Sequence, residues 1–190
     1  MADKTRTGLI QIYTGNGKGK STAAFGLALR AAGCGLRTAI VQFMKKGEWY
    51  GEIAAIKQLP LVDIYSYGGS KFLKKGTPPD QENLDLAAAA MAKARELMAQ
   101  EEIDILILDE PLSGVDIEGE KQLLDMLDEV RRFYDQSILL STHDFATLEE
   151  YADKVILLQS GVLKAGTPAE VLSSPEFQEV FHLSLGRGRG

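Results

Sequence analysis

The chain has 190 residues, a formal net charge of −6 and a hydrophobic content of 45%, which suits one soluble domain built around a single core. The negative charge argues against a general nucleic-acid-binding protein, and no stretch reaches the ~20 apolar residues that a membrane span needs. Cys34 is the only cysteine, which excludes an internal disulfide and a cysteine metal cluster, so the chain is expected to be cytoplasmic.

Apolar runs alternate with helical patterns along the chain. The apolar runs predict strands over residues 9–13, 37–43, 61–67, 103–110, 137–142 and 154–159. The helices are expected over residues 21–33, 51–59, 81–100, 119–134 and 144–152, with one or two short ones over 167–181. A loop rich in Gly, Pro and Lys is expected over residues 68–80, and Asp80 is expected to cap the helix over 81–100. Continuously apolar strands with helices between them predict a mostly parallel sheet that is covered on both faces. The carboxyl ends of such strands meet at one edge, where a ligand is expected.

A glycine-rich segment, "YTGNGKGKST", covers residues 13–22 between the first strand and the first helix. Its glycines free the backbone so that successive N–H groups can point into one hollow. The helix that follows directs the positive end of its dipole toward the same place. A strand, this loop, a lysine, a hydroxyl and a helix in that order predict a phosphate-binding loop and a P-loop NTPase fold.

The residues predicted to contact a bound nucleotide, ATP or ADP, are Thr14, Gly15, Asn16, Gly17, Lys18, Gly19, Lys20, Ser21, Thr22 and Gln42. Lys20 is expected to reach the β- and γ-phosphates, and the Ser21 hydroxyl to ligate Mg²⁺. Thr14 stands where the general pattern has glycine. For Lys18, a solvated loop lysine is an equal alternative. Gln42 ends a strand at the ligand edge.

Two further motifs end strands at the same edge. "ILILDE" closes on Asp109, which is expected to hold the magnesium from outside its direct ligands, and on Glu110, which is expected to polarise a water in line with the γ-phosphate. "LLSTHD" places His143 where it could donate a hydrogen bond to the γ-phosphate oxygens. The alternative for the acidic pair is a helix cap, and for His143 a cap or a solvated side chain.

Residues 7–110 resemble an ATP:corrinoid adenosyltransferase. The segment "YTGNGKGKSTAAFGLALRAAGCGLRTAIVQFMK" is similar to that family's phosphate loop, first helix and second strand, including Thr14. "GEIAAIKQLP", "KFLKKG" and the helix leading into "ILILDE" continue the resemblance. This resemblance implies ATP and a corrinoid as substrates.

Residues 108–182 resemble the nucleotide-binding domain of an ABC transporter instead. "LDEPLSGVD" is similar to that family's Walker B strand and D-loop, with Asp116 as the D-loop aspartate, and "ILLSTHD" to its switch histidine motif. Both families have "LDE" at the join, so the simplest interpretation is a natural or engineered hybrid. We expect one three-layer α/β/α P-loop domain over residues 1–182, adenosyltransferase-like over 7–110 and ABC-ATPase-like over 111–182, and a disordered tail over 183–190.

Each half departs from its family's pattern. "PLSGVDIEGEKQ" replaces the segment that should help to shape the corrinoid site, and no "LSGGQ"-type signature occurs between residues 50 and 108. We therefore expect a chimeric nucleotide-binding protein that takes Mg·ATP or ADP and hydrolyses ATP slowly or not at all. An ATP:cob(I)alamin adenosyltransferase and a folded scaffold with a residual phosphate site are the alternatives. The sequence is compatible with a homodimer and does not determine the oligomeric state.

Overall fold

The structure is a computed structural model that describes residues 8–45, 50–69, 80–113, 115–133, 135–143 and 149–182. Most of the expected loop over residues 68–80, the first half of the expected helix over 144–152 and the whole tail over 183–190 lie outside these ranges. In the described part of the chain, no helix combines the length and the apolar character that a membrane crossing requires.

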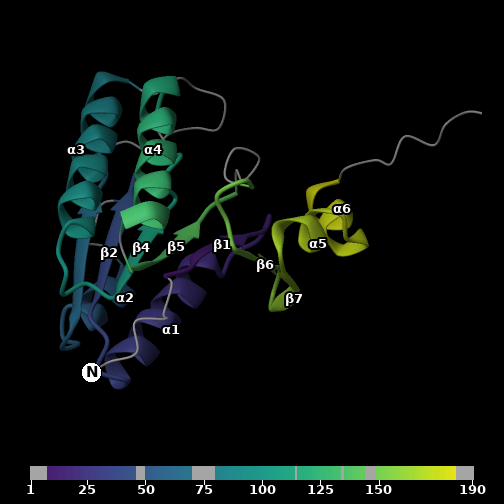
Figure 1. Ribbon diagram of the computed structural model, residues 1–190, viewed down its shortest axis with the longest axis horizontal. Helices are drawn as coiled ribbons and strands as arrows, with labels where there is room; N and C mark the ends of the chain where they lie inside the picture. The colour runs from purple at the N-terminus through teal and green to yellow at the C-terminus, as the bar shows by residue number, and fades with distance from the viewer. Residues whose placement is uncertain are drawn as a thin grey trace, which may run out of the picture.

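The described residues form one sheet flanked by helices (Figure 1). The strands are β1 Ile10–Thr14, β2 Thr38–Phe43, β3 Val62–Tyr67, β4 Ile105–Asp109, β5 Ser137–Ser141, β6 Lys154–Leu158 and β7 Val162–Gly166. The helices are α1 Lys20–Gly33, α2 Gly51–Ile56, α3 Gln81–Met98, α4 Ile117–Phe133, α5 Pro168–Leu172 and α6 Pro175–Phe181.

The strand order is β3-β2-β4-β5-β1-β6-β7, and every neighbouring pair is parallel except β6 and β7. The predicted mostly parallel α/β fold is therefore confirmed. The apolar runs did not predict β7, which pairs with β6 and is the edge strand of the sheet that the described residues form. Its side chains are exposed or half-buried, so it lacks the continuous apolar run by which the inner strands were recognised.

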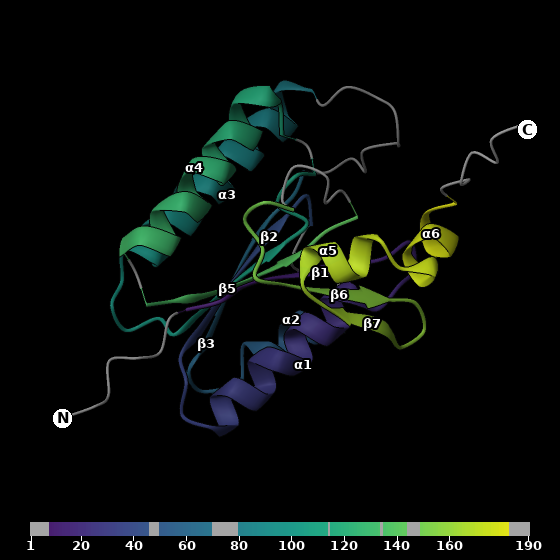
Figure 2. The same cartoon turned by 45° about the vertical axis from the view of Figure 1, so that its right-hand side comes forward.

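The sheet separates two helical layers, as Figure 2 shows. The helices α3 and α4 cover one face, and α1 and α2 cover the other. Alternate residues along a strand supply the two cores: in β4, Leu106 and Leu108 pack with α3 and α4, whereas Ile107 packs with α1. An inner strand such as β4 is apolar at nearly every position because both of its faces are buried.

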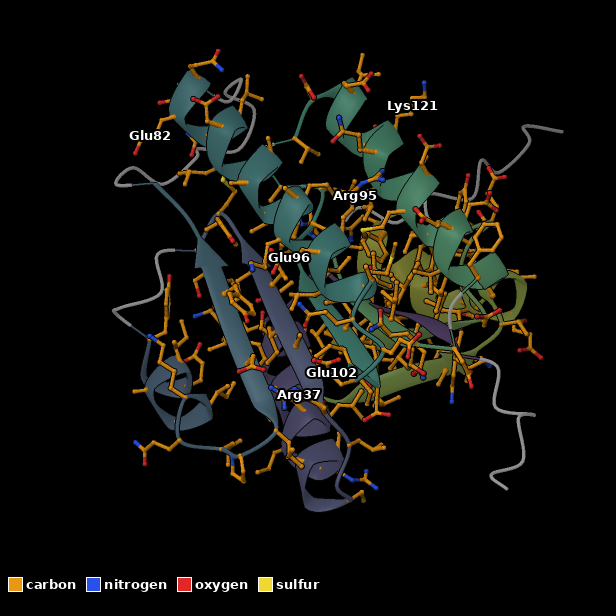
Figure 3. The ribbon with its side chains drawn as sticks, turned by 60° about the vertical axis from the view of Figure 1, so that its left-hand side comes forward. Arg37, Glu82, Arg95, Glu96, Glu102 and Lys121 are labelled. Carbon is orange, nitrogen blue, oxygen red and sulfur yellow. The ribbon has the colours of Figure 1, made fainter. Side chains whose placement is uncertain are left out.

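Local contacts explain where α3 begins and how it packs against α4. The Asp80 side chain accepts a hydrogen bond from the backbone N–H of Asn83 at 3.0 Å, which caps α3 as the sequence predicted. Arg95 of α3 donates to the carbonyl oxygen of Gln122 in α4 at 3.2 Å, and its guanidinium lies 4.0 Å from Glu129. Figure 3 shows Arg95 on the side of α3 that faces α4.

The position of β1 decides where the site lies. Both of its neighbours, β5 and β6, come from the later part of the chain, and β5 separates β1 from β4. The residue pairs across these ladders bring the end of β5 between the glycine-rich loop and the acidic pair at the end of β4.

Candidate functional site

Polar side chains lie at or one residue before the carboxyl ends of four adjacent parallel strands, at one edge of the sheet. In the ladders, Gln42 of β2 is opposite Asp109 of β4, and Asp109 is opposite Ser141 of β5. Ser141 is in turn opposite Tyr13, the residue before Thr14 at the end of β1. The sheet therefore gathers residues that lie up to 128 positions apart into one row.

The glycine-rich loop leaves β1 and runs directly into α1. Gly15 has φ 141°, and a Cβ added there would lie 2.0 Å from the carbonyl oxygen of Leu158 at the end of β6. Gly19, which precedes the first turn of α1, has φ 120°. Both positions use backbone conformations that side chains disfavour, and at Gly15 the neighbouring strand also leaves no room for one.

The Lys20 ammonium lies in the hollow of this loop. Its Nζ donates to the carbonyl oxygens of Gly15 at 3.0 Å and Gly17 at 3.4 Å. It also lies 3.8 Å from Glu110 Oε1, and its side chain is 12% exposed. The loop thus holds one positive charge over the end of β4.

Asp109 is fully buried and receives four donors. The hydroxyls of Ser21 and Ser141 both donate to Oδ1, the former at 2.8 Å. The other oxygen, Oδ2, accepts from Gln42 Nε2 at 3.0 Å and from Lys45 Nζ at 2.6 Å. The predicted loop hydroxyl and the predicted strand-end carboxylate therefore meet.

These partners determine the charge state of Asp109. Burial by itself raises the pKa of this carboxyl, but the Lys45 ammonium and the hydrogen bonds from Lys45, Ser141 and Gln42 outweigh it, so the pKa lies below its ordinary value. Asp109 is an anion at neutral pH. A buried carboxylate beside a hydroxyl is a set of hard oxygen donors, which fits Mg²⁺.

Three residues of this network were missed by the sequence reasoning. Ser141 ends β5 in register with Asp109, so the rule that strand ends share an edge could have found it. Ser66 lies one residue before the end of β3 and donates to Gln42 Oε1 at 2.9 Å, which turns the Gln42 amide nitrogen toward Asp109. Lys45 follows β2 by two residues and reaches the site only because the backbone turns back at Met44, which has φ 54°.

The two predicted catalytic residues lie together. Glu110 has φ 57°, and its N–H donates to the Ser141 carbonyl oxygen at 2.8 Å. Its Oε2 lies 2.9 Å from His143 Nδ1, while its Oε1 faces Lys20. The His143 side chain is 58% exposed and that of Glu110 is 19% exposed. The carboxylate of Glu110 is thus held between the loop lysine and the histidine.

The other residues predicted to contact the nucleotide differ in burial and in their hydrogen-bond partners. Thr14 is fully buried, and its hydroxyl has no hydrogen-bond partner in the described part of the chain. Asn16 donates from Nδ2 to the carbonyl oxygen of Val180 at 3.4 Å, which ties the loop to α6. Lys18 and Thr22 are exposed around the hollow, so the solvated alternative for Lys18 remains compatible with its position.

Comparison with known proteins finds both of the resemblances. Residues 6–161 match the model of the family ATP:corrinoid adenosyltransferase BtuR/CobO/CobP. A corrinoid adenosyltransferase of Pseudomonas aeruginosa is 36% identical over 103 residues, which are 54% of this chain and 50% of that protein. The energy-coupling factor transporter ATP-binding protein EcfA2 of Ligilactobacillus salivarius is 42% identical over 82 residues, which are 43% of this chain and 28% of that protein.

A solved structure of the ATP-binding subunit of an ABC transporter has a TM-score of 0.50 and 20% identity, and the alignment covers 93% of this chain and 88% of that one. This likeness supports the P-loop fold alone. The chain spans half or less of the length of the two curated relatives. The prediction that both P-loop families are represented is confirmed, and the adenosyltransferase match runs to residue 161, beyond the boundary expected at residue 110.

Proposed function

The chain belongs to the ATP:corrinoid adenosyltransferase family, and from this premise we propose that it binds ATP or ADP together with Mg²⁺ at the loop of residues 14–22. The observation that carries the proposal is the 2.8 Å hydrogen bond from Ser21 Oγ to Asp109 Oδ1, between residues 88 positions apart. P-loop proteins hold the magnesium of a bound nucleotide with this pair of groups, a loop hydroxyl and a strand-end aspartate.

Each residue of the site has a role in this proposal. The loop N–H groups and the amino end of α1 bind the phosphates, and Lys20 exchanges its bonds to the Gly15 and Gly17 carbonyl oxygens for bonds to phosphate oxygens. Ser21 and Asp109 hold the metal, and Gln42 keeps the aspartate oriented. When bound, Mg²⁺ supplies neutralisation of the charge on the phosphate oxygens.

Glu110 is placed to act as the base, and slow hydrolysis is expected instead from a missing group of a second subunit. To accept a proton from a water molecule, its carboxylate must be free of Lys20 and correctly oriented. The contact with His143 at 2.9 Å orients it, and Lys20 leaves it when phosphate binds. The absence of an "LSGGQ"-type segment between residues 50 and 108 removes the group that a second subunit supplies in ABC ATPases. The transition-state charge is then stabilised only from within one chain, which lowers the rate by roughly 10³-fold.

Calorimetric titration of Mg·ATP into the full chain tests the binding proposal. We expect Lys20→Ala to weaken binding by about 100-fold or more, because one charge-assisted contact to each of two phosphates is lost. Lys121→Ala is the matched control, since Lys121 is an exposed lysine on α4. Equal binding by wild type and Lys20→Ala, or no binding heat from a chain that melts cooperatively, would favour the scaffold alternative.

A second candidate is transfer of the adenosyl group of ATP to reduced cobalamin, with triphosphate as the other product. The family match supports it, because residues 6–161 include the loop, Asp109, Glu110 and His143. An anaerobic assay with cob(I)alamin distinguishes the two candidates by their products. Triphosphate and adenosylcobalamin would establish transfer, whereas ADP and phosphate would establish hydrolysis.

We also propose that the chain is one P-loop domain of hybrid composition, adenosyltransferase-like before residue 110 and ABC-ATPase-like after it. Curated relatives of both kinds support the hybrid composition. The boundary rests on the "LDE" motif that both families share at the join, while the adenosyltransferase model matches beyond it, to residue 161. Strands of the two parts are interleaved in one sheet, so a fragment of the front part tests whether the parts fold together.

A further inference from the structure

Lys45 lies between Ser21 and Asp109, the two residues that are proposed to hold Mg²⁺. Its Nζ is 2.6 Å from Asp109 Oδ2 and 2.8 Å from Ser21 Oγ. We propose that Lys45 is an internal cation that occupies the magnesium position in the nucleotide-free protein, and that nucleotide-bound Mg²⁺ replaces it. This inference rests on the proposed function, because it concerns the same site.

The charge of Asp109 requires such a partner. Its carboxylate is fully buried, and an ion without a counter-charge is strongly disfavoured away from water. The donors Ser21, Ser141 and Gln42 are neutral, and the ion pair that the structure records for Asp109 in its described residues is with Lys45. Removing the ammonium therefore leaves a negative hollow lined by oxygen atoms.

The backbone directs Lys45 into this position. Met44 has φ 54°, a conformation that is unfavourable for a side chain of this kind, and this turn after the end of β2 is followed by Lys45, whose Nζ reaches Asp109 at the end of β4. Unusual backbone of this sort persists where the surrounding structure maintains it, often at functional sites. Without the turn at Met44, the next residue would continue along β2 and away from Asp109.

The ammonium can leave as well as stay. The Lys45 side chain is 26% exposed, so its flexible stem has a path to water, and a lysine head group is strongly hydrated. A divalent cation and an ammonium on the same two oxygens repel each other, since unit charges ~4 Å apart already interact appreciably near a protein surface. The metal and the Lys45 ammonium therefore exclude each other from the position between Ser21 and Asp109. The phosphate oxygens of a nucleotide supply the further ligands that favour the metal.

A melting experiment without nucleotide tests the exchange. We expect millimolar MnCl₂ to leave the melting temperature of the wild-type chain unchanged and to raise that of Lys45→Met by about 3 °C or more, because a ligand that binds only the folded state stabilises it. In metal-free buffer, Lys45→Met should melt below wild type, since Asp109 has lost its counter-charge. Lys45→Gln, which can still donate to Asp109, is the second variant if Lys45→Met does not fold.

Lys93→Met is the control, because the Lys93 ammonium pairs with Glu96 on α3 at 2.7 Å and should give the wild-type response to MnCl₂. An equal Mn²⁺ shift in wild type and in the Lys45 variants, or no shift in either variant, would overturn the inference. The proposed function fails separately, through the ATP titration of Lys20→Ala. A chain that binds ATP through Lys20 but gains no Mn²⁺ response on loss of Lys45 would refute only the exchange.

Discussion

At the scale of single residues, the site depends on a few side chains with little freedom to vary. Asp109 is oriented by Ser21, Ser141 and Gln42, each from a different element, so its carboxylate cannot rotate without breaking several hydrogen bonds. Such a network is rigid when it is fully satisfied. The groups that would contact a ligand are thus in place before the ligand arrives.

Gly15→Ala tests how closely the loop approaches β6. The new Cβ would lie 2.0 Å from the Leu158 carbonyl oxygen at a φ of 141°, so we expect a loss of about 3 kcal/mol or more in the free energy of unfolding. Gly17→Ala is the control, since a Cβ there meets no atom within 4 Å. Chemical denaturation of the two variants measures the difference, and equal stability would contradict the loop geometry.

Glu110→Gln tests the proposed role of the carboxylate. If Glu110 activates the attacking water, phosphate release from Mg·ATP should fall by roughly 10²-fold while ATP binding persists, because general-base catalysis is lost and the shape of the side chain is kept. The exposed Glu102→Gln serves as the control. Equal phosphate release from wild type and Glu110→Gln would exclude the role.

At the scale of secondary-structure elements, short helices depend on their caps. The helix α5 has five residues and begins with a capping box in which the Thr167 hydroxyl accepts from the Glu170 N–H at 3.4 Å and Glu170 Oε2 accepts from the Thr167 N–H at 2.8 Å. The backbone bond and the hydroxyl bond from Thr167 lower the pKa of the Glu170 carboxyl. The cap holds α5 beside β6 and β7, and the end of β6 at Leu158 lies next to Gly15 of the phosphate loop.

Glu170→Ala should therefore destabilise the chain in a pH-dependent way. A lowered pKa in the folded state means that the charged cap contributes stability above the ordinary glutamate pKa of ~4.3, and that this contribution is lost as the pH falls through the folded-state value. Melting temperatures of wild type and variant should differ most at neutral pH and converge in acid. A difference that is independent of pH would show that the charge of Glu170 is not involved.

At the scale of the whole molecule, the two parts of the chain cannot be separated into two sheets. The strand β1 carries the phosphate loop, yet both of its neighbours, β5 and β6, follow residue 110. The strands β2, β3 and β4 are adjacent to one another, but β5 stands between them and β1. The front part alone would lack both strands with which β1 pairs.

A fragment of residues 1–113 should consequently show no cooperative melt, whereas the full chain should unfold in one transition, with equal calorimetric and van't Hoff enthalpies. Circular dichroism and calorimetry on both chains measure this. Two transitions in the full chain, or a cooperative melt of the fragment, would indicate that the hybrid consists of independently folding halves.

The sequence alone predicted most of what depends on neighbours along the chain. Buried strands were visible as apolar runs, α3 was marked by its Asp80 cap, and the phosphate loop was marked by its order of residue types. The meeting of Ser21 with Asp109 also followed, because parallel strands present their carboxyl ends at one edge.

Tertiary structure alone decided the rest. The edge strand β7 has exposed side chains and is stabilised by pairing with β6, which no local pattern reports. The ion pair of Lys45 with Asp109 needs a backbone turn at Met44 and the adjacency of β2 and β4, two elements that are far apart in sequence. Local propensity is set by a residue and its near neighbours, whereas strand order and the contacts across it are set by the packing of the whole sheet.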